Sequence, residues 1–143
     1  MIRIHQEIVD PKIGDCLRAC VASILELPIT LVPNFVEYQH RYQKIFMDYM
    51  RTIGGYDSVF VTQIDKNNPY KLNVHHSFMN FGTIKGVTIA SIRSKKYPGG
   101  SHAVLINNKF RVVFDPTTDL DYSQEGRNLS GSDDLYGYWI FKY

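Results

Sequence analysis

The stretch that decides the fold runs from Gly14 to Leu25 and reads GDCLRACVASIL. Apolar or small side chains recur along it at the spacing of a helix that is buried on most of its circumference. Asp15 is a favourable N-cap, because its carboxylate can accept a bond from an unpaired N–H of the first turn. The pattern therefore predicts a helix that begins at Cys16 and ends near Leu27-Pro28, since proline disfavours helix in the residue before it.

Cys16 occupies the first turn of this predicted helix, and that position bears on its chemistry. Unpaired N–H groups and the positive end of the helix dipole meet at a helix N-terminus, and both favour the thiolate, the reactive form of cysteine. The negative charge of Asp15 acts in the opposite direction, so the sequence leaves the pKa of Cys16 open. Cys20, one turn further on, is interpreted as a small core residue.

Beyond this helix the pattern changes from helical to extended. A second helix is predicted over residues 36–52, ended by Gly54-Gly55. Residues 63–86 are predicted to form turns. The predicted strands cover residues 58–62, 86–92, 101–106, 110–114 and 136–143, with a hairpin turn at Asn107-Asn108. Helices followed by antiparallel strands indicate one α+β domain spanning residues 1–143, with the Cys16 helix packed on the sheet.

Composition excludes several broad classes of protein. A hydrophobic fraction of 44% argues against disorder, and a net charge of +2 is too small to indicate nucleic-acid binding. No apolar run approaches the roughly 18 residues of a membrane span, and the first residues lack signal-peptide anatomy. We therefore expect a cytoplasmic protein. His75-His76 is too isolated to complete a zinc site with the two cysteines, so no metal or organic cofactor is expected.

Three residues in order along the chain suit acyl-transfer chemistry. Cys16 begins a helix, His102 begins a predicted strand, and Asp115 ends the strand that pairs with it. The hairpin between the last two brings His102 and Asp115 to the same open end, where the carboxylate can orient the imidazole. An imidazole held in this way can activate a thiol as a nucleophile. Gln6 and the Cys16 N–H are candidates for holding the oxyanion that would develop.

At these residues the chain resembles the small papain-like cysteine peptidase homologues common in bacteriophage genomes, which are related in pattern to bacteriocin-leader peptidases. The resemblance rests on GDCLRAC at residues 14–20, LP at 27–28, VPNF at 32–35, GGSHAV at 99–104 and VFDP at 113–116. It implies a papain-like fold, a Cys16–His102–Asp115 triad, and hydrolysis of a peptide or isopeptide bond. For a phage-encoded protein it implies the cytoplasm of the host cell.

The position of Gln6 departs from the pattern of that family. Papain-like enzymes place their oxyanion glutamine closer to the cysteine, whereas Gln6 precedes Cys16 by ten residues and Asp10 occupies the nearer position. An ionised carboxylate has no proton to donate. Gln6 is therefore expected to act only if residues 7–13 loop out.

The residues also allow a second interpretation from a different functional class. A catalytically silent papain-like scaffold could bind a small anionic ligand or a host protein, as a phage counter-defence factor would, because fold does not fix function. Four basic side chains are candidates for ligand binding in either case: Arg18, Arg93, Lys95 and Lys96. The last three lie on a basic loop, expected to be flexible, that leads into His102, and positive charge at the rim of a cleft attracts anions. The default interpretation of these four residues is solvated surface charge.

Overall fold

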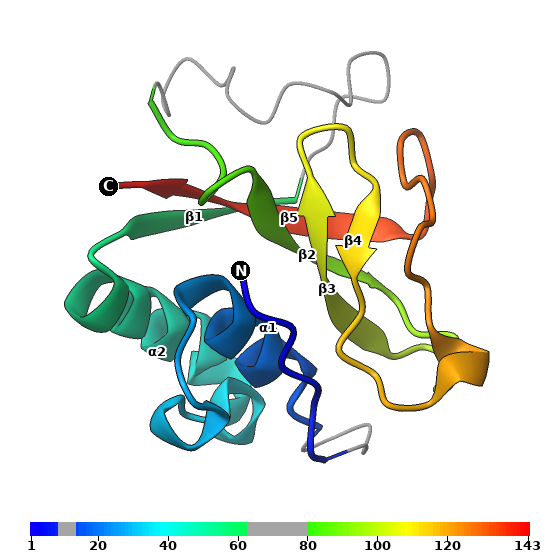
Figure 1. Cartoon of the computed structure of the whole chain (residues 1–143), viewed down its shortest axis with the longest axis horizontal. Helices are drawn as coiled ribbons and strands as arrows, with labels where there is room; N and C mark the ends of the chain where they lie inside the picture. The colour runs from blue at the N-terminus through cyan, green and yellow to red at the C-terminus, as the bar shows by residue number, and fades with distance from the viewer. Residues whose placement is uncertain (9–13, 63–79) are drawn as a thin grey trace.

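The computed structural model describes residues 1–8, 14–62 and 80–143, which combine helices with an antiparallel sheet in an α+β arrangement (Figure 1). Asp10, His75, His76 and most of the turns expected over 63–86 lie outside the described residues. Among the described residues, both α-helices precede the five strands, and one short helical segment lies between the last two strands. This order is the one that the change of period in the sequence predicts.

The first helix, α1, covers Cys16–Leu25, so its predicted start at Cys16 is confirmed. It ends two residues before the predicted limit, where Glu26 adopts the left-handed conformation with φ 59° and Leu27 N–H donates to the Ala22 carbonyl. The predicted capping bond of Asp15 is wrong, because its side chain makes no bond to the first turn. That carboxylate is engaged elsewhere, as described below.

The predicted second helix is divided into three segments. They are η2 (Phe35–Arg41), α2 (Tyr42–Tyr49) and η3 (Met50–Gly54), and a short η1 (Ile29–Leu31) precedes them. The break falls at Gln39, whose φ of 52° and ψ of −122° are incompatible with a continuous helix. Hydrophobic spacing does not reveal this kink, because the apolar stripe continues across it.

Five strands form one fully antiparallel sheet in the order β1-β5-β2-β3-β4. Their bounds are β1 Asp57–Val61, β2 Val87–Arg93, β3 Ser101–Asn107, β4 Val112–Phe114 and β5 Leu135–Lys142. All but β4 agree with the predicted strands to within one residue. Strand β4 starts two residues after the predicted start at residue 110, because Phe110 adopts φ 61° in the turn and cannot continue the hydrogen-bond ladder of a strand. A short η5 (Leu120–Tyr122) lies between β4 and β5.

Side chains alternate between the two faces of the sheet, and each face packs into its own core. Ala103 and Leu105 of β3 join the core beneath α1, whereas Val104 and Ile106 join the opposite core with Phe110. Helices α1 and α2 both cover the first face, and η5 lies at the far end of the sheet (Figure 1). The packing of α1 on β3 brings the N-terminus of the helix next to the start of that strand.

Among the described residues, no single helix has both the length and the apolar character to cross a membrane. Cys16–Leu25 taken with Ile29–Gly54 meets the length and composition test only as a pair, and the two parts are bent by 107°.

Candidate active site

Asp115 and His102 form the best-defined contact of the site. His102 Nε2 lies 2.6 Å from Asp115 Oδ1, and the carboxylate is fully buried. Asp115 also accepts the N–H groups of Thr117, at 3.0 Å, and Gln124, at 2.9 Å. Burial raises the pKa of Asp115, but the bond and charge of His102, with these two N–H groups, hold it below the ordinary value. The carboxylate is therefore ionised and fixed in orientation.

His102 lies between this carboxylate and the sulfur of Cys16. Because Nε2 contacts Asp115, Nδ1 is the nitrogen left for the hydrogen bond with Cys16. Burial lowers the pKa of His102, but the hydrogen bonds with Asp115 and Cys16, and the negative charges of both, raise it from 6.5 to about 10. At neutral pH these interactions favour the imidazolium.

The pKa of the Cys16 thiol is lowered, opposite to the shift of His102. Burial raises its pKa, yet the hydrogen bond and charge of His102 and the N–H groups of Ala103 and Leu17 lower it below 9.0. The Ala103 N–H donates to Cys16 Sγ at 3.4 Å. Cys20 differs sharply: it is wholly buried, and burial together with the charges of Cys16 and Asp115 raises its pKa well above 9.0. Of the two cysteines, Cys16 alone has the environment of a thiolate nucleophile.

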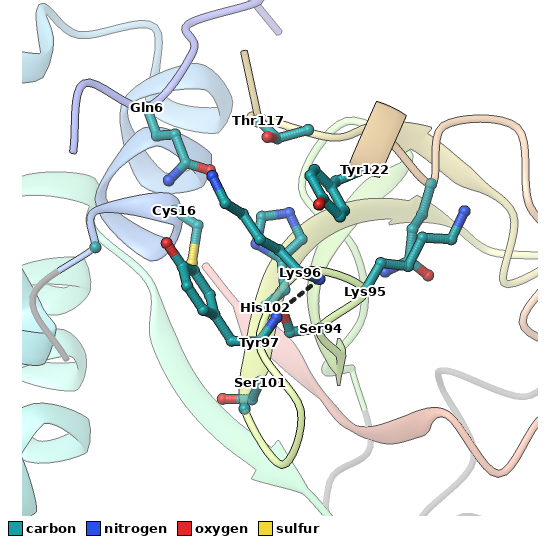
Figure 2. Close-up of a pocket in the computed structure, with 13 residues that line it drawn as sticks. Gln6, Cys16, Ser94, Lys95, Lys96, Tyr97, Ser101, His102, Thr117 and Tyr122 are labelled. Carbon is teal, nitrogen blue, oxygen red and sulfur yellow. Dashed lines mark hydrogen bonds between the residues drawn. The ribbon is translucent and has the colours of Figure 1, made fainter. Parts of the chain in front are cut away.

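Gln6 reaches the same site in spite of its distance along the sequence. It lines a pocket with Cys16 and His102, and its side chain lies on the Cys16 side of that pocket (Figure 2). Its backbone N–H donates to Pro116 O at 2.9 Å, which ties it to the residue that follows Asp115. Its side-chain Nε2 donates one proton to Ile8 O at 2.8 Å, so one amide proton is left for another acceptor.

Asp15 holds the residues after Gln6 in place. Its carboxylate is fully buried and accepts the N–H of Ile8 at 2.8 Å and that of Glu7 at 3.0 Å. The Asp15 N–H in turn donates to Ile8 O at 3.2 Å. These bonds bring Glu7 and Ile8 against Asp15, next to Cys16; the loop expected over residues 7–13 lies mostly outside the described residues.

Two pockets meet at the Cys16–His102 pair and share Gly14 and Ser101 as well. The polar pocket has a volume of about 60 Å³ and adds Gln6, Thr117, Gln124 and the loop carrying Lys95 and Lys96. The apolar pocket has a volume of about 220 Å³. Its further lining residues are mostly apolar or aromatic: Leu17, Val36, Tyr42, Phe60, Ile89, Ala90, Ser91, Ala103 and Trp139. The sulfur thus lies between a smaller pocket lined mostly by polar residues and a larger one lined mostly by apolar residues.

Phe60 of the apolar pocket depends on a glycine in the neighbouring strand. A Cβ atom on Gly137 would lie 2.6 Å from Phe60 Cζ and 2.7 Å from Val61 O. Only glycine therefore leaves room for this ring in its present position.

The four predicted basic residues fall into two groups. Arg18 Nε donates to Val32 O at 2.7 Å and Nη1 lies 3.7 Å from Asp15, while Arg93 pairs with Asp134 at 2.8 Å. Neither residue lines the two pockets described above, and both guanidinium groups hold parts of the fold together. Their role in ligand binding stays a prediction. Lys95 and Lys96 do line the polar pocket.

Sequence patterns did not single out Thr117 and Gln124, which hold Asp115, as parts of the site. Gln124 is 2% exposed, and its Nε2 also donates to Arg93 O at 3.0 Å. It lies in a polar segment without periodicity, where the sequence offers no signal that distinguishes it from an ordinary loop residue.

In the described ranges, no three His, Cys, Asp or Glu side chains are grouped so that they could hold a metal ion. Comparisons with protein-family models, with curated proteins and with solved structures found no match.

Proposed function

We propose that this chain is a papain-like cysteine hydrolase that cleaves an amide bond with Cys16 as the nucleophile, His102 as the acid–base residue and Asp115 as the residue that orients His102. The observation that carries the proposal is the position of His102 between Cys16 and a buried carboxylate 2.6 Å from its Nε2. The opposite pKa shifts of the thiol and the imidazole favour an ion pair that is ready to react.

In the proposed reaction, the Cys16 thiolate attacks the acyl carbon and forms a carbon–sulfur bond. The electron pair of the carbonyl moves to its oxygen, where the Cys16 N–H and the free amide proton of Gln6 are the available donors. The carbon–nitrogen bond then breaks, and the amine leaves with the proton from His102 Nδ1. Water attacks the thioester, His102 takes its proton, and the acid product leaves the regenerated thiolate.

The test is hydrolysis of a mixed library of peptides and isopeptides, read by mass spectrometry of the products. We expect cleavage by the native chain and by Cys20→Ser, and none by Cys16→Ala. Hydroxylamine added during turnover should release acyl hydroxamate from a Cys16 thioester. Cleavage that persists in Cys16→Ala would refute the proposal.

One observation favours the second candidate, a silent scaffold that binds a ligand. Lys95 and Lys96 line the polar pocket, and their positive charge can attract an anionic ligand without any reaction at Cys16. A scaffold of this kind would retain a small molecule or a protein through purification and would form no acyl adduct. Native mass spectrometry of the purified chain distinguishes the two candidates, because an added mass that is covalent and located on Cys16 supports the hydrolase.

A further inference from the structure

The loop between β2 and β3 carries Lys96 over the polar pocket, and hydrogen bonds within the loop hold it together. Ser94 Oγ accepts the N–H groups of Lys96, at 3.2 Å, and Tyr97, at 3.0 Å. The Ser94 N–H donates to Gly100 O, and the Gly100 N–H donates to Tyr97 O. The sequence predicts a flexible segment here, but these bonds give the loop a defined course that fixes the backbone of Lys96 beside the site.

The side chain of Lys96 is also positioned. Its Nζ lies 5.6 Å from the centre of the Tyr97 ring and 5.5 Å from that of Tyr122, so two aromatic rings hold one ammonium group. Figure 2 shows the side chain running across the pocket toward Gln6, while the neighbouring Lys95 points away from Cys16.

The charge of Lys96 has no partner of opposite sign within the described part of the chain, where no carboxylate lies within 4.0 Å of its Nζ. The two arginines expected at the site are, in contrast, engaged with Asp15 and Asp134. Tyrosine rings stabilise a cation but do not neutralise it, so the ammonium keeps its capacity for an anion.

We propose that Lys96 is the specificity-determining residue of the cleft and binds a carboxylate of the substrate, such as an Asp or Glu side chain, next to the bond that Cys16 attacks. The inference rests on the proposed function for the attack itself. A carboxylate is favoured over a nucleotide phosphate because the polar pocket is only about 60 Å³, well below the roughly 300 Å³ of a typical pocket for a larger small molecule.

The test compares two alkylating reagents that differ in charge. Iodoacetate carries a carboxylate and iodoacetamide does not, and both report the reaction at Cys16. At low ionic strength, Lys96→Gln should slow alkylation by iodoacetate about three- to fivefold, as expected for one partly exposed charge, and change the iodoacetamide rate less than twofold. The difference should shrink as salt is added. Lys95→Gln removes the same charge one residue away and should have a clearly smaller effect.

A protection experiment tests the chemical class. N-acetylglutamate should slow the iodoacetamide reaction of the native chain more than N-acetylglutamine does, and Lys96→Gln should abolish the difference. Equal effects of Lys95→Gln and Lys96→Gln, or protection by inorganic phosphate as strong as that by N-acetylglutamate, would overturn the inference. If Cys16 reacts with neither reagent, the proposed function fails. If Cys16 reacts but Lys96→Gln leaves the ratio of the iodoacetate rate to the iodoacetamide rate unchanged, only the proposed role of Lys96 fails.

Discussion

Replacing Asp115 by Asn should move the pH range in which Cys16 reacts. The bond from Asp115 to His102 Nε2 stabilises the imidazolium, which in turn stabilises the thiolate. A hydrogen bond to a charged group contributes about 1.5–3 kcal/mol, and one pKa unit corresponds to 1.36 kcal/mol. Loss of the negative charge should therefore lower the pKa of His102 and raise that of Cys16 by about one to two units. The sign is fixed, because burial without the imidazolium favours the neutral thiol.

The assay is the rate of iodoacetamide alkylation of Cys16 from about pH 5 to pH 10. The native chain should reach half of its maximal alkylation rate below pH 9.0, which is the ordinary pKa of a cysteine thiol. The Asp115→Asn variant should reach half of its maximal rate about one to two pH units above the native midpoint. Asp121→Asn is the matched control, since it removes an exposed carboxylate of η5. Circular dichroism shows whether each variant is folded. An unmoved midpoint in folded Asp115→Asn would refute the coupling between Asp115 and Cys16.

Three other changes test separate parts of the molecule. Brief iodoacetamide treatment should label Cys16 well before Cys20, because Cys20 is fully buried with a raised pKa; equal labelling in peptide maps would remove Cys16 as the nucleophile. Asp15→Ala should lower the free energy of unfolding in urea by about 2–4 kcal/mol, because two backbone N–H groups lose their acceptor, and a loss under about 0.5 kcal/mol would contradict this. Gly137→Ala should lower the free energy of unfolding by about 1–3 kcal/mol, because the added Cβ clashes with Phe60. Adding Phe60→Leu to this variant should recover part of the loss, and no recovery would count against the clash.

Local patterns predict much of the fold. The start of α1 at Cys16 and four of the five strands follow from apolar spacing and from turn residues, because tertiary packing reinforces those preferences here. The kink at Gln39 and the late start of β4 after Phe110 depend on backbone angles that both residues adopt against their preference. Such angles are imposed by the packed structure and leave no trace in hydrophobic periodicity.

The sequence likewise predicts some features of the candidate site and misses others. Hairpin geometry predicts that His102 and Asp115 meet, and the distance of 2.6 Å bears this out. The sequence could not tell which cations stay available to a ligand, because Arg93 pairs with Asp134, far along the chain, and Arg18 donates to Val32 O as well as facing Asp15. The sequence predicts that the Asp15 carboxylate caps the helix that follows it, whereas it accepts the N–H groups of Glu7 and Ile8, which precede it.

The bonds from the Glu7 and Ile8 N–H groups to Asp15 have a consequence for how this site tolerates changes in chain length. Gln6 is tied to Pro116, and Ile8 is tied to Asp15, so the number of residues between Ile8 and Asp15 does not set the distance from Gln6 to Cys16. Related chains are therefore expected to gain or lose residues in this interval while they keep an acid directly before the cysteine. A search pattern with a fixed glutamine-to-cysteine interval would pass over them, and one that requires the acid–cysteine pair would retain them.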